Sequence, residues 1–334
     1  MENNLQDLLS DAFRKIETAN LSATKMSGVE SGLIDLDRVT NGWQSGELYI
    51  IAGRPSMGKT SLALTTAYNA AIKFKRSIAF ITLESTSDRI VNRLVSMGCE
   101  IPSERIIKGK LEIKEWEKLV SITGTMSDSQ FIIDDSHTLS MSSLRTRAIE
   151  LVEKFSIRTL FIDFIQLLSS EEGNRYNNRE QEISFISRSL KSLAKELHIS
   201  IVAISQLSRN VEYRGGSKRP ILADLRDSGA LEDDADMILF IYRPEYYGIE
   251  FDEDNEPTRG CAELSIAKNR NGSTDIIRLR FVENIGKFLD FDSNEIASPI
   301  INSRMIVGSR MIDNNDSRYA FKWLRDDFKE IGRE

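Results

Sequence analysis

The sequence predicts an α/β fold, with a mostly parallel central sheet flanked by helices and antiparallel hairpins near the C-terminal end. Runs rich in β-branched residues alternate with segments of helical length, which is typical of buried parallel strands. These runs are "LYIIA" (48–52), "SIAFITL" (77–83), "FIID" (131–134), "TLFID" (159–163), "ISIVAIS" (199–205) and "MILFIY" (237–242). After Gly260 the pattern changes, and "RNGST" (270–274) places an Asn-Gly turn between two strand-like runs.

The helices follow from apolar residues at helical spacing. The clearest lies between the fourth and fifth strands, in "NREQEISFISRSLKSLAKELH" (178–198). An earlier stripe predicts a linker helix over residues 1–20, formed by Leu5, Leu8, Leu9, Ala12, Phe13 and Ile16. So short a helix must dock to be stable, either on its own core or on a neighbouring copy of the chain. Residues 21–30 are polar and small, and we interpret them as a linker.

These patterns divide the chain into a main domain over 31–291 and a C-terminal tail over 292–334. In the tail, "YAFKWLRDDFKEI" (319–331) is compatible with an amphipathic helix. The chain has 334 residues, of which 40% are hydrophobic and 28% charged, so it can bury a sizeable core. We expect a cytoplasmic protein with no membrane span, because no apolar run is long enough and the start is acidic. Cys99 and Cys261 lack metal-ligand spacing and are interpreted as reduced thiols.

A phosphate-binding loop follows the first predicted strand. Gly53, Gly58, Lys59 and Thr60 fit the pattern G-x-x-x-x-G-K-[ST], with a strand before and a helix after. Glycines let backbone N–H groups turn inward, and the helix start adds partial positive charge toward phosphates. The alternative is a strand–turn–helix corner without a ligand. The predicted nucleotide-binding residues are Gly53, Arg54, Pro55, Ser56, Met57, Gly58, Lys59, Thr60 and Ser61.

Polar residues at other strand ends are candidates for the remaining chemistry. Asp163 ends a strand that is longer and more apolar than the one before Asp134 and Asp135, and it is favoured over them as the carboxylate that joins Thr60 in holding Mg²⁺. Glu84 is placed to act as a general base, or else caps the next helix. Gln206 follows "ISIVAIS" and either reads the γ-phosphate or is an ordinary loop residue.

Further segments make the sequence resemble the DnaB-type replicative DNA helicases, which carry a RecA-like P-loop ATPase core. The segments are "SGLIDLDRVTNGWQSGELYIIAGRPSMGKT", "FITLES", "LFIDFIQLL", "AKNRNG" and the stretch with "KRP", "DLRDSG" and "DDAD" between residues 218 and 236. The last stretch separates this family from RecA-type recombinases. The resemblance implies an ATP- and Mg²⁺-dependent hexamer that moves 5′→3′ along single-stranded DNA in a bacterial cytoplasm, of the cell itself or as a phage or plasmid protein.

The resemblance also implies roles for individual residues. Glu84 would be the catalytic glutamate, Asp163 the magnesium-binding aspartate, and Gln206 the γ-phosphate sensor. Lys268 and Arg270 match the basic pair that a neighbouring subunit inserts into the ATP site, and the linker helix would dock on the next subunit. Expected DNA contacts are Arg209, Arg214, Lys218, Arg219, Arg226, Asp227 and Gly229. A basic loop of this kind can follow a phosphate backbone without reading sequence, although a solvated surface loop is the alternative.

The sequence departs from the family at several points. A helicase loader and primase are further partners that the resemblance implies. The helical N-terminal collar that contacts primase in the family is not seen ahead of the predicted linker helix, so the expectation of primase binding is the weaker of the two. Asp227 and Asp233 stand where the family commonly has Glu and Gln. The alternatives are a RecA-fold, DNA-dependent ATPase that acts as a recombinase or loader-like switch without unwinding, and a P-loop protein with no role on DNA.

Overall fold

The structure, a computed structural model, describes residues 4–6, 9–10, 13–14, 17, 26–136, 139–170, 179–214 and 216–292, without the side chains of 226–228. The expected C-terminal tail lies outside these residues except for its first position. Most of the expected linker helix and linker lie outside them too. The described residues of the linker helix that are helical are 5–6, 9–10, 13–14 and 17. No helix within the described ranges is long and apolar enough to cross a membrane.

The described part of the chain forms a nine-stranded sheet in the order β3-β2-β4-β5-β1-β6-β7-β8-β9. The first six strands are parallel, and β7 to β9 continue the sheet as antiparallel hairpins. The strands are β1 (Leu48–Gly53), β2 (Ile78–Thr82), β3 (Phe131–Asp134), β4 (Thr159–Asp163), β5 (Ser200–Gln206), β6 (Met237–Tyr242), β7 (Cys261–Asn269), β8 (Ile276–Val282) and β9 (Lys287–Asp290). The predicted α/β fold and every predicted strand are therefore confirmed.

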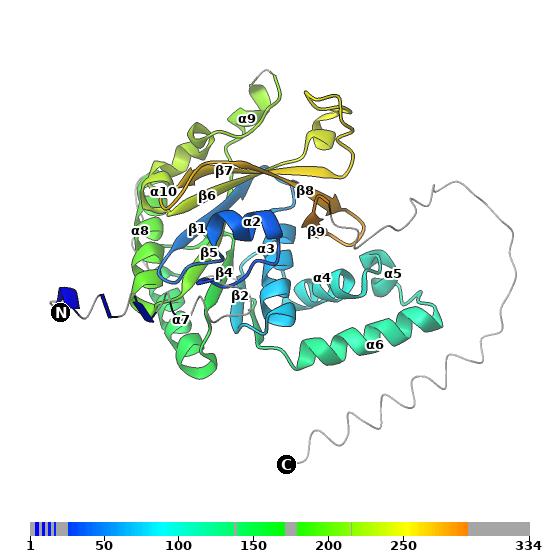
Figure 1. Ribbon diagram of the computed structural model, residues 1–334, viewed down its shortest axis with the longest axis horizontal. Coiled ribbons are helices and arrows are strands. Elements are labelled where there is room, and N and C mark those ends of the chain that lie inside the picture. Colours follow the sequence, from blue (N-terminus) through cyan, green and yellow to red (C-terminus); the bar gives the residue numbers. More distant parts are fainter. Residues whose placement is uncertain are drawn as a thin grey trace, which may run out of the picture. The chain divides into compact units, whose positions relative to one another are not determined.

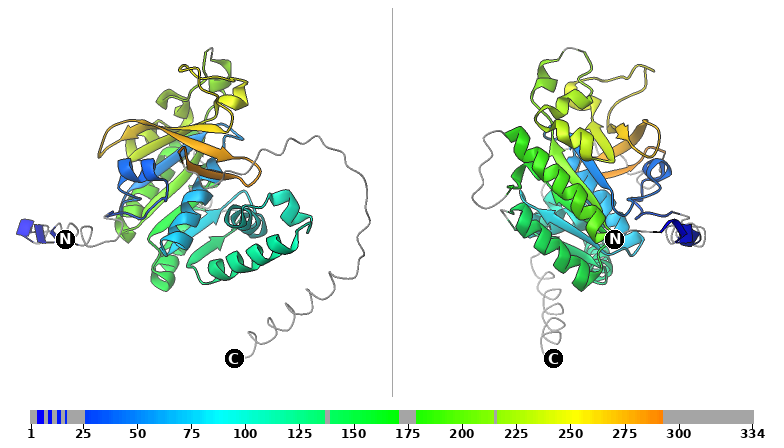
Figure 2. Two further views of the ribbon diagram at one scale, coloured as in Figure 1. Left: turned by 45° about the vertical axis from the view of Figure 1, so that its right-hand side comes forward. Right: turned by 90° about the vertical axis from the view of Figure 1, so that its left-hand side faces the viewer.

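Helices fill the connections between the parallel strands and cover both faces of the sheet. They are α2 (Ile34–Thr40), α3 (Lys59–Tyr68), α4 (Ser87–Cys99), α5 (Ser103–Ile107), α6 (Ile113–Ser127), α7 (Met141–Phe155), α8 (Arg179–Leu197), α9 (Asn210–Tyr213) and α10 (Gly229–Asp234). A π-helical turn (Asn69–Lys73) extends α3, and 3₁₀ turns lie at Ile165–Leu167, Leu222–Ser228 and Pro244–Tyr247. Figures 1 and 2 show α7 and α8 on one face and α3 and α4 on the other.

The alternation of side chains along β1 explains the two-layered core. Tyr49 and Ile51 pack in one cluster with Leu62 of α3. Ile50 lies in the other cluster with Leu190 of α8. Successive residues of a strand point to opposite faces, so an uninterrupted apolar run serves a strand that is covered on both sides.

The packed domain begins slightly before the expected boundary at residue 31. Val29 is buried and forms a bridge with Trp43. Glu30 is fully buried and receives two hydrogen bonds from Arg76, from Nε at 2.8 Å and Nη2 at 2.7 Å. Residues 29 and 30 thus belong to the domain, although the polar composition around them gave no sign of burial.

The parallel arrangement brings the ends of β1, β5, β2 and β4 to one edge of the sheet. Pairing of Gly53 with Gln206 and of Thr82 with Asp163 aligns the carboxyl ends of these strands. Ligands bind at this edge in open α/β sheets. The fold therefore collects the polar residues that follow these strands in one place.

Candidate functional site

The phosphate loop connects β1 to α3 and has the backbone that its glycines predict. Gly58 adopts a left-handed φ of 96°, and a Cβ there would lie 2.9 Å from the ring of Phe288. Only glycine meets both conditions without strain. The loop therefore presents the N-terminal end of α3 to a cavity of ≈ 580 Å³ that Pro55, Ser56 and Ser61 also line.

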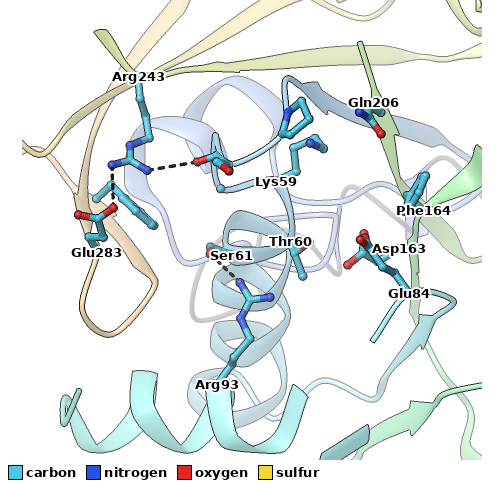
Figure 3. A pocket seen from close by; sticks show the side chains of 14 residues that line it. Lys59, Thr60, Ser61, Glu84, Arg93, Asp163, Phe164, Gln206, Arg243 and Glu283 are labelled. Carbon is cyan, nitrogen blue, oxygen red and sulfur yellow. Dashed lines mark hydrogen bonds and ion pairs between the residues drawn. The ribbon is translucent and has the colours of Figure 1, made fainter. Parts of the chain in front are cut away.

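Lys59 projects into this cavity from the first turn of α3 (Figure 3). Its Nζ donates a hydrogen bond to the carbonyl oxygen of Arg54 at 3.0 Å. Burial lowers the pKa of Lys59 to about 8, although the nearby carboxylates of Asp163 and Glu84 act in the opposite direction. A cation partly removed from water at a helix N-terminus is suited to binding phosphate.

Asp163 lies beside Thr60 at the end of β4, and the structure fits it as a metal ligand. It is 2% exposed, and its Oδ2 is buried without a hydrogen-bond partner in the described residues. Burial raises its pKa, the Glu84 carboxylate adds to this, and a hydrogen bond with the Thr60 side chain opposes it. A buried carboxylate with an unpaired oxygen, next to a hydroxyl, supplies the oxygen ligands that Mg²⁺ takes together with phosphates.

The competing aspartates on β3 are engaged elsewhere. Asp134 forms an ion pair with Arg147 at 2.6 Å and accepts a hydrogen bond from the Ser136 hydroxyl. Asp135 accepts hydrogen bonds from Ser87. Neither aspartate lines the cavity. The structure therefore favours Asp163, as the strand pattern did.

Glu84 and Gln206 complete the set of predicted residues around the cavity. Glu84 follows β2 and is exposed, and Gln206 ends β5. The backbone N–H of Gln206 donates to Gln166 Oε1 at 3.3 Å, and Gln166 in turn donates to the Ser205 hydroxyl at 2.9 Å. In Figure 3 Glu84 lies next to Asp163, and Gln206 faces the same space from β5. An acid–base group and an amide thus flank the phosphate loop.

Two arginines of the cavity were missed at the sequence level. Arg93 of α4 donates from Nη2 to the Ser61 hydroxyl at 2.7 Å, and burial lowers its pKa. Arg243 follows β6 and donates to the carbonyl oxygen of Ser56 at 3.3 Å, while its guanidinium lies 4.3 Å from the ring centroid of Phe281. The strand-end rule could have found Arg243. Arg93 lies in mid-helix and gave no signal.

Two residues of the predicted loop set do not point into the cavity. Met57 is a core residue with 1% exposure. The side chain of Arg54 turns away from the cavity and binds Glu212. The loop pattern located the backbone correctly but could not separate side chains that face phosphate from those that face the protein.

The basic segment, residues 209–219, holds most of the predicted DNA contacts, but two of its arginines are in ion pairs. Arg214 contacts Asp224 at 3.1 Å. Arg219 binds Glu263 at 2.8 Å and Glu253 at 2.6 Å. In this conformation these two cations hold the segment against the domain, which the sequence did not indicate.

The other predicted contacts are more accessible or lie outside the described side chains. Lys218 lies 5.4 Å from the ring centroid of Tyr247. Arg209 lines a second cavity, and no side-chain hydrogen bond or ion pair of Arg209 occurs within the described part of the chain. Gly229 begins α10, and a Cβ there would meet nothing within 4 Å. The side chains of Arg226 and Asp227 are not described.

Lys268 and Arg270 lie at the other end of the sheet. Lys268 Nζ donates to the carbonyl oxygens of Glu232 and Asp233, and Arg270 Nη2 donates to that of Asp233. The register aligns Tyr49 with Met237 and Met237 with Asn269. At about 3.3 Å per residue this is roughly 13 Å along the strands from Gly53. The two side chains lie together, since both donate to the carbonyl oxygen of Asp233, but they lie away from the cavity of their own chain.

Comparison with known proteins gives consistent results. The family described as DnaB-like helicase C terminal domain matches residues 28–290. The chain is 37% identical over 289 residues both to "Replicative DNA helicase DnaB" of Geobacillus stearothermophilus and to "Replicative DNA helicase DnaC" of Bacillus subtilis. It covers 62% of each of these relatives, with 86% of its own length.

Among solved structures it resembles one described as an ATPase domain, with a TM-score of 0.78 and 33% identity over 87% of this chain and 100% of that one. It also resembles a DnaB-like replicative helicase described with its interactions with primase, with a TM-score of 0.74 and 33% identity. This likeness covers 87% of this chain and 68% of that one.

Proposed function

The chain belongs to the family of DnaB-like helicase C-terminal domains, and on this basis we propose that it is the ATP-hydrolysing motor of a replicative DNA helicase. The motor translocates 5′→3′ on single-stranded DNA and unwinds the duplex ahead of it. The observation that carries the proposal is the convergence of Lys59, Thr60, Asp163, Glu84 and Gln206 from separate strand ends around one cavity.

Each of these residues has a separable task in ATP hydrolysis. Backbone N–H groups of the loop hold the phosphates, and Lys59 binds the β- and γ-phosphate oxygens. Thr60 and Asp163 would hold Mg²⁺, which neutralises charge on the phosphates when bound. Glu84 accepts a proton from the attacking water. Gln206 contacts the γ-phosphate, and its strand leads directly into the basic segment.

We assign Lys268 and Arg270 to the ATP site of a neighbouring subunit. Both side chains lie far from the cavity of their own chain. They can therefore take part in catalysis only at the site of a neighbouring subunit. A cation supplied across a subunit boundary stabilises charge that develops in the transition state. This assignment requires a head-to-tail assembly in which each subunit contacts the next, for which we propose a homohexameric ring.

Two exposed apolar surfaces support such a ring. Leu5 and Phe13 of the linker helix are each 69% exposed. On α6, Ile113 is 80% and Val120 is 47% exposed, and they share a helix face at a spacing of seven. Apolar faces of this kind mark interaction sites. We propose that the linker helix of one subunit packs on α6 of the next.

On the DNA, the proposed contacts track phosphates. Arg209 and Lys218 supply charge, Gly229 supplies a backbone N–H group, and Arg226 and Asp227 complete the set. Arg214 and Arg219 act in this proposal by holding the basic segment in place. Such contacts give salt-sensitive binding with little sequence preference.

The proposal extends to partners and place of action. One structural relative is described with its interactions with primase. We propose primase and a helicase loader as partners of the whole protein, and the primase contact is expected to depend on the collar domain of the family. The place of action would be the bacterial cytoplasm, where a chromosome, phage or plasmid is replicated.

Unwinding of forked DNA tests the proposal directly. The protein is mixed with ATP, Mg²⁺ and a forked duplex that carries a single-stranded tail of either 5′ or 3′ polarity, and strand release is followed by fluorescence. We expect release only from the fork with a 5′ tail. DNA-stimulated hydrolysis without release from either fork would instead support a RecA-fold ATPase that acts as a recombinase or loader-like switch.

A further inference from the structure

Arg54 belongs to the phosphate loop by sequence but reaches a different part of the molecule. It lines a second cavity of ≈ 390 Å³ together with Gln206 and Arg209. Its side chain is 10% exposed. Because Pro55 follows it, the backbone of Arg54 is restricted to extended conformations, which limits the directions in which its side chain can leave the loop.

The guanidinium of Arg54 contacts two residues that follow β5: Leu207, directly after the strand, and Glu212 of the basic segment. Nη1 donates to the carbonyl oxygen of Leu207 at 3.0 Å, and Nε donates to Glu212 Oε1 at 2.8 Å. The backbone N–H of Leu207 donates back to the carbonyl oxygen of Gly53 at 3.3 Å. The hydroxyl of Tyr247 donates to the same Glu212 oxygen at 3.4 Å. The phosphate loop is thus bonded directly to the start of the basic segment.

The same arginine is also in contact with Lys59. Lys59 Nζ donates to the carbonyl oxygen of Arg54 at 3.0 Å. Arg54 therefore meets the proposed phosphate-binding lysine through its main chain and Glu212 through its side chain. Charge-assisted hydrogen bonds are short and directional, so movement of the loop at Arg54 alters the geometry of its bond to Glu212.

The remaining ion pairs of the basic segment do not involve the loop. Arg214 binds Asp224, and Arg219 binds Glu253 and Glu263. Within the described ranges, the pair of Arg54 with Glu212 is the ion pair between side chains of the phosphate loop and of the basic segment. A change in the loop can therefore reach the segment through one identified contact.

We propose that the Arg54–Glu212 pair is a positioning contact that couples nucleotide binding in the phosphate loop to single-stranded DNA binding by the basic segment. The inference rests on the proposed function, since it presumes that the segment binds DNA. Coupling of two binding sites is reciprocal, so DNA must alter nucleotide affinity by the same factor. Glu212 acts through Arg54 and the backbone, without touching either ligand.

The test compares DNA affinity with and without nucleotide. Binding of fluorescein-labelled oligo-dT is measured by anisotropy without nucleotide and with a non-hydrolysable ATP analogue and Mg²⁺, and the ratio of the two affinities is the coupling factor. The variant is Glu212→Gln, which removes the charge and keeps the shape. The matched control is Glu263→Gln, which removes one of the two ion pairs of Arg219 in the same segment but touches no part of the phosphate loop.

We expect Glu212→Gln to lower the coupling factor at least threefold while basal ATP hydrolysis without DNA stays near the wild-type rate. Glu263→Gln should change DNA affinity by the same factor in both conditions and leave the coupling intact. A wild-type coupling factor in Glu212→Gln would overturn the inference and leave the proposed function standing. Wild-type protein that bound no oligo-dT would instead remove the proposed function, and this inference with it.

Arg54→Lys alone covers the case in which Glu212→Gln is poorly folded by its melting curve, and it should also lower the coupling factor. Where both variants fold, a double-variant cycle tests whether the two residues act as a unit. Arg54→Lys keeps the positive charge but loses the two-pronged geometry of the guanidinium. If the pair acts as a unit, the loss of coupling in the variant that combines Arg54→Lys with Glu212→Gln is smaller than the product of the two separate losses, because both changes weaken the same contact. If the loss of coupling in the double variant equalled the product of the two separate losses, the two residues would not act through each other.

Discussion

At the carboxyl ends of the parallel strands, Lys59 and Asp163 face one cavity, and Asp163 keeps a buried oxygen without a hydrogen-bond partner in the described residues. At the opposite end of the sheet, Lys268 and Arg270 are bound to backbone carbonyl oxygens of α10. Lys59 was predicted from the glycine-rich loop pattern and Asp163 from its strand end, whereas Lys268 and Arg270 were assigned from the family resemblance. Only the first of the two places assembles a site within one chain.

The contrast between the two ends agrees with the proposed role of the basic pair in a neighbouring subunit. The cavity contains groups suited to phosphates, to a metal ion and to activation of water, but the basic pair that the family resemblance assigns to it lies beyond its reach. Both observations are explained if each subunit supplies its basic pair to the cavity of a neighbouring subunit. The two ends of the sheet would then meet only in the assembly, and variants at either end can test this.

The largest effect is expected for Arg270→Ala. Loss of an arginine that stabilises transition-state charge lowers hydrolysis by about 10³–10⁵ in related enzymes. ATP affinity should change little, because the phosphates are held by the loop of the other subunit. Phosphate release measures the rate, and binding of a fluorescent ATP analogue measures the affinity. Hydrolysis at the wild-type rate would show that this end of the sheet plays no part in catalysis.

Lys59→Ala tests the other end and should lower ATP hydrolysis by about 10²–10³, as for removal of one strong donor at a reacting group. The fold should survive, since the side chain faces the cavity, and circular dichroism controls for this. Mixing Lys59→Ala with Arg270→Ala subunits gives a stricter test of the two ends together. Some interfaces then combine an intact loop from one subunit with an intact arginine from the other. Partial recovery of ATP hydrolysis would therefore place Arg270 in trans.

Ile113→Ser should weaken assembly about tenfold, which corresponds to the loss of about 1.4 kcal/mol of burial at each interface. Ile113 is 80% exposed in the chain, so its replacement should leave the melting temperature nearly unchanged. Sedimentation velocity over a range of concentrations measures the assembly. Lys114→Ser, on another face of α6, is the matched control. Equal assembly of both variants would argue against α6 as the docking surface.

How far the sequence predicted the fold depends on how local each signal is. Buried parallel strands have continuous apolar runs, so "MILFIY" and its counterparts were found at nearly correct bounds. Glu30 was assigned to the linker because residues 21–30 are polar and small. Its burial depends on Arg76, which is distant in the sequence, and no pattern within one segment contains that information.

The site shows the same limit. Asp163 and Gln206 could be predicted because a strand end fixes where a side chain must lie. Arg214 and Arg219 were read as free cations, but their partners Asp224 and Glu263 come from other elements. Composition counts charges, and only the folded chain shows which of them are already paired.

The pH dependence of ATP binding probes the cavity without a substitution at the opposite end. The pKa of Lys59 is lowered to about 8, and the phosphates of ATP bind its protonated form. Affinity should therefore be constant below that value and fall as pH rises through it, by roughly eightfold between about pH 7.5 and 9. Lys59→Arg stays protonated over this range and should give a flat profile. A flat wild-type profile would contradict the lowered pKa.

The smallest effects are expected for substitutions in the basic segment. They distinguish cations that form ion pairs from cations that do not. Arg209→Ala should weaken binding to oligo-dT and to mixed-sequence strands by a similar factor, about threefold, and reduce the salt slope by about 1. Its melting temperature should not change, because Arg209 has no side-chain partner in the described residues. Arg214→Ala should instead lower stability by about 1–2 kcal/mol, since Asp224 is buried and loses its charged donor. Anisotropy titrations at several salt concentrations and melting curves distinguish the two outcomes. If Arg214→Ala left stability unchanged and reduced the salt slope as Arg209→Ala does, its ion pair would be open in solution and Arg214 would contact DNA directly.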